Sequence, residues 1–170
     1  MTTETILDLD SILNESFEGV EAAPEFLVFD NGVYDFVVKK IELKKQEAKD
    51  KAKAIAEGKP TEWVKVHFTY AMEAVVQLES DKSLPPKVGS MTSENFTWSD
   101  KGKPYLKARI AQLVVAAGGS EEDADGMSLT DVINTFPDAV RFRSTVIKRS
   151  TPTDNGVYED NRFTNIVPVA

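Results

Sequence analysis

The chain has 170 residues, of which 41% are hydrophobic and 28% charged, and its net charge is -8. These values are typical of one globular domain, and no apolar run approaches the roughly 18 residues that a membrane span needs. The lack of cysteine and the single histidine exclude disulfides, cysteine nucleophiles, and zinc or iron-sulfur centres, so we expect no cofactor. The acidic amino terminus is unlike a signal peptide, which predicts a cytoplasmic protein.

The negative charge is concentrated in two places. Residues 1–25 contain seven acidic and no basic side chains, whereas the rest of the chain carries 21 acidic and 20 basic ones. Four of these 21 acids cluster at Glu121, Glu122, Asp123 and Asp125, and without them the body has a net charge of +3. A local cationic surface is therefore compatible with an acidic protein.

The first 25 residues are predicted to form an acidic arm, followed by one domain over residues 26–170. Apolar residues recur in the arm at roughly helical spacing: Ile6, Leu9, Ile12, Leu13 and Phe17. This spacing predicts a short amphipathic helix that ends before Gly19 and Pro24. Such a helix either docks on a partner or packs on its own domain.

The body begins with a turn signal at Asn31-Gly32 and a predicted strand over residues 33–43. In residues 44–58 lysines alternate with Glu, Asp and Ala. This composition favours a helix, and we expect a helical or mobile excursion before the next strand.

The stretch over residues 62–79 alternates most clearly between apolar and polar side chains. Its even positions are nearly all apolar, which predicts a half-buried strand with that face in the core. The odd face begins with Trp63, Lys65 and His67, an aromatic, a cation and an imidazole that point outward. Such a face is typical of a strand on which nucleic-acid bases stack. It equally fits an ordinary exposed face with Trp63 packed under a neighbouring loop.

A third strand is predicted over residues 88–98, and a period of 3.6 then predicts a helix over 104–117. A second helix is expected over 128–136, with Ser128 as N-cap and Asp131 completing a capping box. Two final strands over 139–149 and 162–169 are joined by a turn-rich segment.

One acidic motif is similar to part of a metal-binding loop. Glu121-x-Asp123-x-Asp125-Gly126 resembles the first half of a calcium loop. Its twelfth position would be Val132, however, so the bidentate Glu of such loops is missing. The motif is therefore predicted to be a solvated acidic loop without a metal.

Five strands with helices between the third and fourth follow the order of an OB-fold. We therefore predict a mainly β protein, an OB-fold-like five-stranded Greek-key barrel with helices between strands 3 and 4. Other small mixed barrels share this order.

An OB-fold that binds single strands needs a cationic groove for phosphates and aromatic planes for bases. The predicted nucleic-acid-binding residues are those expected on the outer faces and first loop: Trp63, Lys65, His67, Arg141, Arg143, Lys39, Lys44, Lys45, Lys148 and Arg149. In this prediction the two arginines of the fourth strand lie beside Trp63. The alternative is that Arg141 and Arg143 pair with carboxylates across the sheet, and that the lysine-rich excursion is a solvated helix.

Four segments carry a family resemblance: Gly32-x-Tyr34-x-Phe36-x-Val38, Trp63-Val64-x-Val66-x-Phe68, Phe96-x-Trp98 before a helix ending Ala116-Ala117-Gly118, and Arg162-Phe163-x-Asn165-Ile166. Over about residues 26–169 the chain resembles phage-encoded OB-fold single-stranded DNA-binding proteins. The resemblance implies binding without sequence preference in phage DNA replication and recombination, in the host cytoplasm.

The acidic segment departs from that family's pattern. Those proteins often carry an acidic tail at the carboxyl end, which recruits replication partners and competes with DNA, whereas here the acids lie at the amino end. The arm is therefore expected to meet a phage or host replication protein, or the recruiting role is absent.

Catalysis is not expected, because the chain has no Gly-rich phosphate loop, Gly-x-Ser-x-Gly elbow or paired histidines. The alternative to DNA binding is a phage virion structural or protein-interaction module, which the net charge of -8 favours. Open sheet edges also predict self-association.

Overall fold

The computed structural model describes residues 9–18 and 25–170, which form a mainly β fold. Five strands make one antiparallel sheet: β1 (Gly32–Glu47), β2 (Glu62–Leu78), β3 (Met91–Thr97), β4 (Arg141–Thr153) and β5 (Gly156–Val167). Their order in the sheet is β3-β2-β1-β4-β5. The strands β3 and β5 therefore form its two edges.

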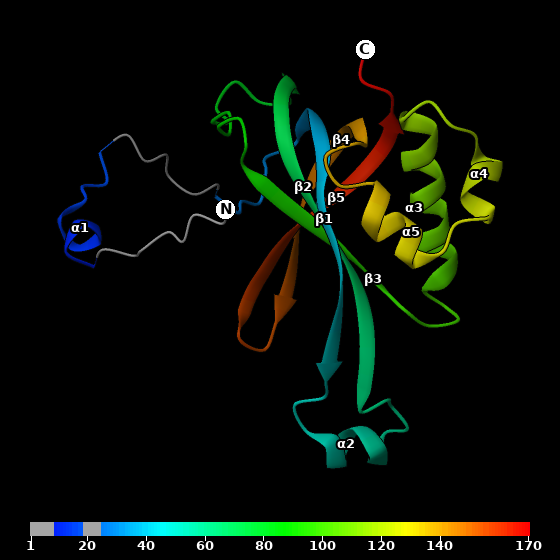
Figure 1. Ribbon diagram of the computed structural model, residues 1–170. Coiled ribbons are helices and arrows are strands. Elements are labelled where there is room, and N and C mark those ends of the chain that lie inside the picture. The colour runs from blue at the N-terminus through cyan, green and yellow to red at the C-terminus, as the bar shows by residue number, and fades with distance from the viewer. Residues whose placement is uncertain (1–8, 19–24) are drawn as a thin grey trace, which may run out of the picture.

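The described helices lie before and between the strands. They are α1 (Leu9–Asn14), α2 (Lys51–Ala56), α3 (Lys103–Ala116), α4 (Glu121–Asp125) and α5 (Leu129–Thr135). Figure 1 shows α3, α4 and α5 together on one flank of the sheet and α2 at the tip of the β1–β2 hairpin. None of the helices in the described part of the chain has the length and apolar character needed to cross a membrane.

The long alternating strand is confirmed as β2, but only the middle of its even face lies in the core. Val76 near its end is 42% exposed, because the pairing with β1 shifts register there. Val66, Phe68, Tyr70 and Met72 are fully buried. The two longer predicted helices are confirmed as α3 and α5, and the Ser128 capping box of α5 is present.

The lysine-rich excursion was predicted too long. Pairing between β1 and β2 continues to Glu47 opposite Glu62, so Lys44 and Lys45 lie on a strand. Only α2 is helical, and it begins where the Asp50 side chain accepts a hydrogen bond from the Lys53 amide. Cross-strand pairing thus overrides the helix-favouring composition of residues 44–47.

Two further predictions were wrong. The acidic segment is not a loop but the short helix α4, because Ser120 and Asp123 form a capping box at its start. The last two strands are longer than expected and reach Thr153 and Gly156. Gly156 adopts a φ of 127°, which lets the chain turn sharply between them.

The predicted arm lies partly outside the described residues, which applies to Ile6, Gly19 and Pro24. Its described part forms α1, and that helix buries no residue. The division at residue 25 stays a prediction.

An aromatic cluster fills the interior of the curved sheet. Phe36 of β1 lies 5.5 Å from Phe142 of β4 and 5.6 Å from Phe163 of β5, between ring centroids. Tyr70 of β2 lies 4.9 Å from Phe142. Apolar residues of α3, including Leu106 and Leu113, pack on this cluster. Its aromatic pairs come from four strands, so they hold the sheet in its curved form.

The edges of the sheet are bridged by the segment over residues 25–29. Its backbone pairs with Met91 of β3 through bonds of 2.8 and 2.9 Å to Glu25 and Leu27. On the other side, the Asn161 side chain of β5 accepts a hydrogen bond from the Phe29 amide and donates one to the Phe29 carbonyl, both at 2.8 Å. The segment thus occupies the gap between β3 and β5.

We expect Asn161→Ala to destabilise the protein strongly, because Asn161 and Phe29 are buried. The substitution leaves two buried backbone groups of Phe29 without partners, at a cost of about 1–3 kcal/mol for each. Urea unfolding measures the loss, with Asn134→Ala on the exposed face of α5 as the matched control. Equal unfolding midpoints for the two variants would show that Asn161 does not stabilise the contact between β5 and residues 25–29.

Candidate nucleic-acid interface

Four of the predicted binding residues meet on one face of the β1–β2 hairpin. Trp63 lies opposite Gln46, Lys65 opposite Lys44, and His67 opposite Glu42. Side chains alternate between faces along a strand, so Trp63, Lys65, His67 and Lys44 share the outer face. Lys45 lies opposite Val64, on the other face of the hairpin.

The outer face continues onto β3. Lys65 lies opposite Thr97, and His67 lies opposite Asn95. The His67 Nδ1 atom is 2.5 Å from Asn95 Oδ1, a contact that orients the imidazole. A polar face therefore extends over three neighbouring strands.

The β1–β2 hairpin is cationic although the protein is acidic. Residues 39–67 contain nine lysines and five acidic residues, a net charge of +4. Lys40 and Lys44 lie 3.0 and 3.4 Å from Glu42, and their hydrogen bonds, Lys40 first, lower the pKa of that carboxyl. Lys65 forms no ion pair with any described residue, so its charge is available to a ligand.

The arginines of β4 are not beside Trp63, so that expectation was wrong. Arg141 lies opposite Val37 of β1, whereas Trp63 lies opposite Gln46. Nine positions of β1 separate these two pairs, which is about 30 Å along a strand. The reason is register, since β4 pairs only with the first part of β1.

Both arginines instead pair with carboxylates across the sheet, as the alternative held. Arg141 Nε lies 3.0 Å from Glu73 Oε1. Arg143 donates two hydrogen bonds to the buried Asp35, from Nε at 2.8 Å and from Nη2 at 3.2 Å. These bonds raise the pKa of the Arg143 guanidinium above its ordinary value, so it stays charged.

The remaining predicted cations also have acidic partners. Lys39 pairs with Asp138 at 2.8 Å, and Lys148 lies 3.5 Å from Asp30. On the β4–β5 hairpin, Arg149 holds Asp160 by two hydrogen bonds of 2.7 and 3.1 Å, which raise the pKa of Arg149. Most of the cations among the ten predicted residues are thus already paired with carboxylates and are not free to neutralise the charge of a ligand.

A groove of about 1150 Å³ runs along the gap between β3 and β5. Its walls are formed by these strands, residues 26–28 and residues 105–112 of α3. Four cations line it, Lys65, Arg109, Arg149 and Arg162, and the first of them joins the groove to the outer face of β2.

Three exposed aromatic side chains also line this groove, and none of them was predicted. Phe26, Tyr105 and Tyr158 are exposed by 60%, 68% and 58%. They come from three distant parts of the chain, so no local pattern connects them. The only sequence signal is in residues 158–162, where Tyr158, Asp160 and Arg162 alternate along β5.

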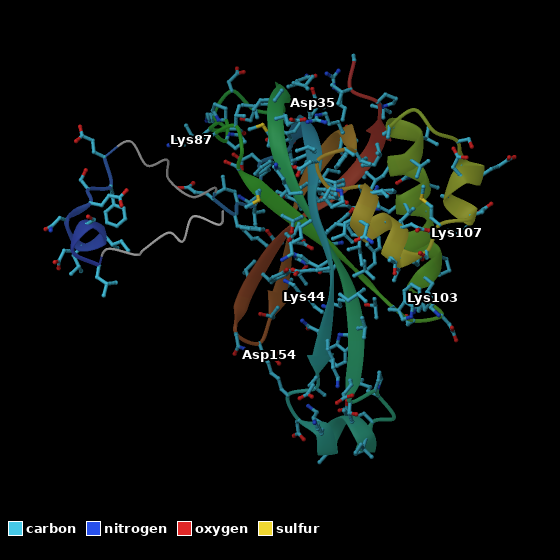
Figure 2. The ribbon with its side chains drawn as sticks, viewed as in Figure 1. Asp35, Lys44, Lys87, Lys103, Lys107 and Asp154 are labelled. Atoms are coloured by element: carbon cyan, nitrogen blue, oxygen red, sulfur yellow. The ribbon has the colours of Figure 1, made fainter. Side chains whose placement is uncertain are left out.

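Two hairpins contribute to the groove. Figure 1 shows the β1–β2 and β4–β5 hairpins projecting from the same side of the sheet, and Figure 2 places Lys44 on the first and Asp154 at the tip of the second. Lys65 enters the groove from the first hairpin, and Arg149 and Tyr158 enter from the second. Side chains from both hairpins therefore line the groove.

A largely buried ion pair lines the groove. Arg109 of α3 lies 2.8 Å from Glu94 of β3 through Nε, and its Nη2 donates to the Phe163 carbonyl of β5 at 2.9 Å. Tyr70 donates to Glu94 at 2.5 Å. Burial raises the pKa of Glu94 and holds the pKa of Tyr70 well above its usual range. The network joins β2, β3, α3 and β5.

The acidic motif offers no metal centre. Glu121–Asp125 forms α4, and Asp125 pairs with Lys107 at 2.9 Å. Across residues 9–18 and 25–170, no group of three or more His, Cys, Asp or Glu side chains is arranged to hold a metal ion.

No protein-family model matches the sequence, and no curated protein matches it. The groove and the adjoining outer face are therefore the features that bear on function.

Proposed function

We propose that this protein is an OB-fold single-stranded DNA-binding protein that acts, without sequence preference, in phage DNA replication or recombination. The strand order β3-β2-β1-β4-β5 supports the OB-fold, because joining β3 to β5 gives the order of that partly open barrel. Asn161 and Arg109 join those two edges through side chains. The position of α3 between β3 and β4 agrees with the same fold.

The observation that carries the proposal is the groove between β3 and β5. There, two cations without an ion pair among the described residues, Lys65 and Arg162, occur together with exposed aromatic rings. In this proposal Lys65, Arg149 and Arg162 contact phosphates, and bases stack on Phe26, Tyr158 and Tyr105. Stacking is tolerant of sequence because every base has a π-face. The groove thus offers both elements that single-strand binders combine.

The bound strand would also cross the outer face of the sheet. Lys65 and Asn95 both line the groove, and His67 contacts Asn95. A strand leaving the groove therefore meets His67, Lys65 and Trp63 in turn on β2. The three-strand face and the groove form one continuous path.

Charge elsewhere favours the same path. Residues 118–140 contain six acidic side chains and no lysine or arginine. This segment, with α4 and α5, repels phosphates, whereas the β1–β2 hairpin attracts them.

Fluorescence anisotropy with a labelled oligo-dT tests the proposal. Three phosphate contacts predict that the logarithm of the association constant falls with that of salt with a slope of about -2. Lys65→Ala combined with Arg162→Ala should weaken binding and bring the slope closer to zero by about 1.4.

The control removes the same charge from another surface. Lys82→Ala with Lys87→Ala also deletes two cations that have no ion pair within the described residues, in the loop between β2 and β3. Figure 2 labels Lys87 there, at the opposite end of the sheet from α2. No binding at low salt, or equal slopes for the two double variants, would refute the proposed site.

A protein-interaction or virion role is the second candidate, and α1 favours it. Leu9, Leu13 and Phe17 are exposed among acidic neighbours, as expected of a segment that docks on a partner. Absence of DNA binding together with recovery of the protein in purified phage particles would establish this role instead.

A further inference from the structure

A second groove lies between the helices and the start of β4. It has a volume of about 530 Å³ and is lined mainly by apolar side chains, among them Val114, Met127, Phe136 and Val140. Its surroundings are acidic, since α4 begins with Glu121 and Glu122, and neither pairs with a cation in the described part of the chain. We call this feature the helical groove.

The tip of the β1–β2 hairpin has the opposite character. The helix α2 buries only Ala54, and its apolar residue Ile55 is 70% exposed. Lys49 and Lys53 lie in the same tip and form no ion pair with a described residue. Figure 1 shows α2 at the far end of the hairpin, well away from α3, α4 and α5 of the same molecule. The tip therefore combines an exposed apolar side chain with a net charge of +2 over residues 48–61.

We propose that the hairpin tip of one copy docks in the helical groove of a second copy. Ile55 enters the apolar floor, and Lys49 and Lys53 meet Glu121 and Glu122. Charge selects this occupant over two other exposed apolar segments. The residues around α1 are acidic like the rim of the groove, and residues 79–90, which include the exposed Leu84, have no net charge. Opposite charges at the edge of a contact also favour association.

The contact joins two different surfaces, so it is heterologous. Each copy keeps one free tip and one free groove, and copies can therefore add head to tail into an open chain. One isoleucine and a few lysines make a small contact area, so association of the free protein is expected to be weak.

Such a contact would make DNA binding cooperative, a consequence that rests on the proposed function. Two copies on one strand have a high effective concentration, which strengthens a weak contact between them. The docking itself does not depend on DNA.

Sedimentation velocity at low salt tests the docking without DNA. We expect the sedimentation coefficient of the unmodified protein to rise with concentration. Ile55→Asp, which damages the tip, and Glu121→Lys with Glu122→Lys, which damages the groove, should each weaken association by about tenfold or more. Leu84→Asp, an equally exposed apolar position in the loop between β2 and β3, should have no effect.

Mixing the two damaged variants gives the decisive result. Ile55→Asp retains an intact groove, and the Glu121→Lys, Glu122→Lys variant retains an intact tip. An equimolar mixture should therefore form a one-to-one dimer that cannot grow. A mixture that stays monomeric, or an unmodified protein that stays monomeric at its highest attainable concentration, would overturn the docking. Anisotropy with an oligo-dT that is long enough for only one copy measures the DNA affinity of Ile55→Asp without any contact between copies. This measurement separates a failure of the docking from a failure of DNA binding. Unfolding midpoints like that of the unmodified protein verify that the variants are folded.

Discussion

Replacing Phe26 and Tyr158 together with alanine is expected to weaken binding of oligo-dT by about 30-fold or more. Both rings are exposed in the groove between β3 and β5, on opposite sides of the gap. Each base stacked on an aromatic ring contributes about 1–3 kcal/mol, so two lost stacks cost at least about 2 kcal/mol. Fluorescence anisotropy at constant salt measures the change.

Val157→Ala is the matched control for Tyr158. Val157 is exposed on the same hairpin, but as the neighbouring residue of β5 it points to the opposite face and does not line the groove. We expect its substitution to leave affinity unchanged. A loss shared equally by Val157→Ala, or full affinity in the Phe26 and Tyr158 double variant, would place the bases elsewhere.

Arg109→Ala is expected to lower the free energy of unfolding by about 3–5 kcal/mol. The substitution leaves the largely buried Glu94 carboxylate without its cation, and the Phe163 carbonyl of β5 loses a donor. The connection between β3 and β5 on the α3 side is then lost. Urea unfolding at neutral pH measures the effect.

The loss should depend on pH in a definite direction. Burial already raises the pKa of folded Glu94 above its ordinary value of 4.5, and removing Arg109, which lowers it, raises it further. A carboxyl with a raised folded pKa binds its proton more tightly in the folded state, so stability falls as the pH rises above 4.5 through the folded pKa. Arg109→Ala is therefore most destabilising at neutral pH and less so in acid.

Adding Glu94→Gln to Arg109→Ala provides the control for this mechanism. The glutamine carries no charge, and its amide oxygen can still accept from Tyr70. We expect it to restore part of the lost stability and to remove the added pH dependence. A pH-independent loss in Arg109→Ala would show that packing, rather than charge, dominates at this position.

The elements recognised from sequence are those with a strong local signal. The strand β2 was evident because apolar and polar residues alternate along it, and α5 because Ser128 and Asp131 form a capping box. The helix α4 was missed although Ser120 and Asp123 carry the same signal, since it contains only five residues and they are mostly acidic. Residues 44–47 were assigned wrongly because their pairing partners lie across the hairpin at residues 62–65.

The residues of the candidate site also differ in whether a local signal in the sequence could place them. Trp63, Lys65 and His67 could be grouped from sequence, since one strand sets their common face. The two β4 arginines could be assigned to an outer face but not to a position along β1, because a register depends on which residues of two strands meet. That register gave them Asp35 and Glu73 as partners and separated them from Trp63.

The sequence by itself determined the mainly β class, the core face of β2, the longer helices and the uneven charge. Each follows from local periodicity, capping or composition, which depend on neighbours in the chain. Only the tertiary structure decided which cations stay unpaired and which aromatic rings share a groove. The three exposed aromatic residues of the groove, Phe26, Tyr105 and Tyr158, lie together because the curvature of the sheet brings its edges β3 and β5 close to each other. Contacts between these two edges depend on long-range packing.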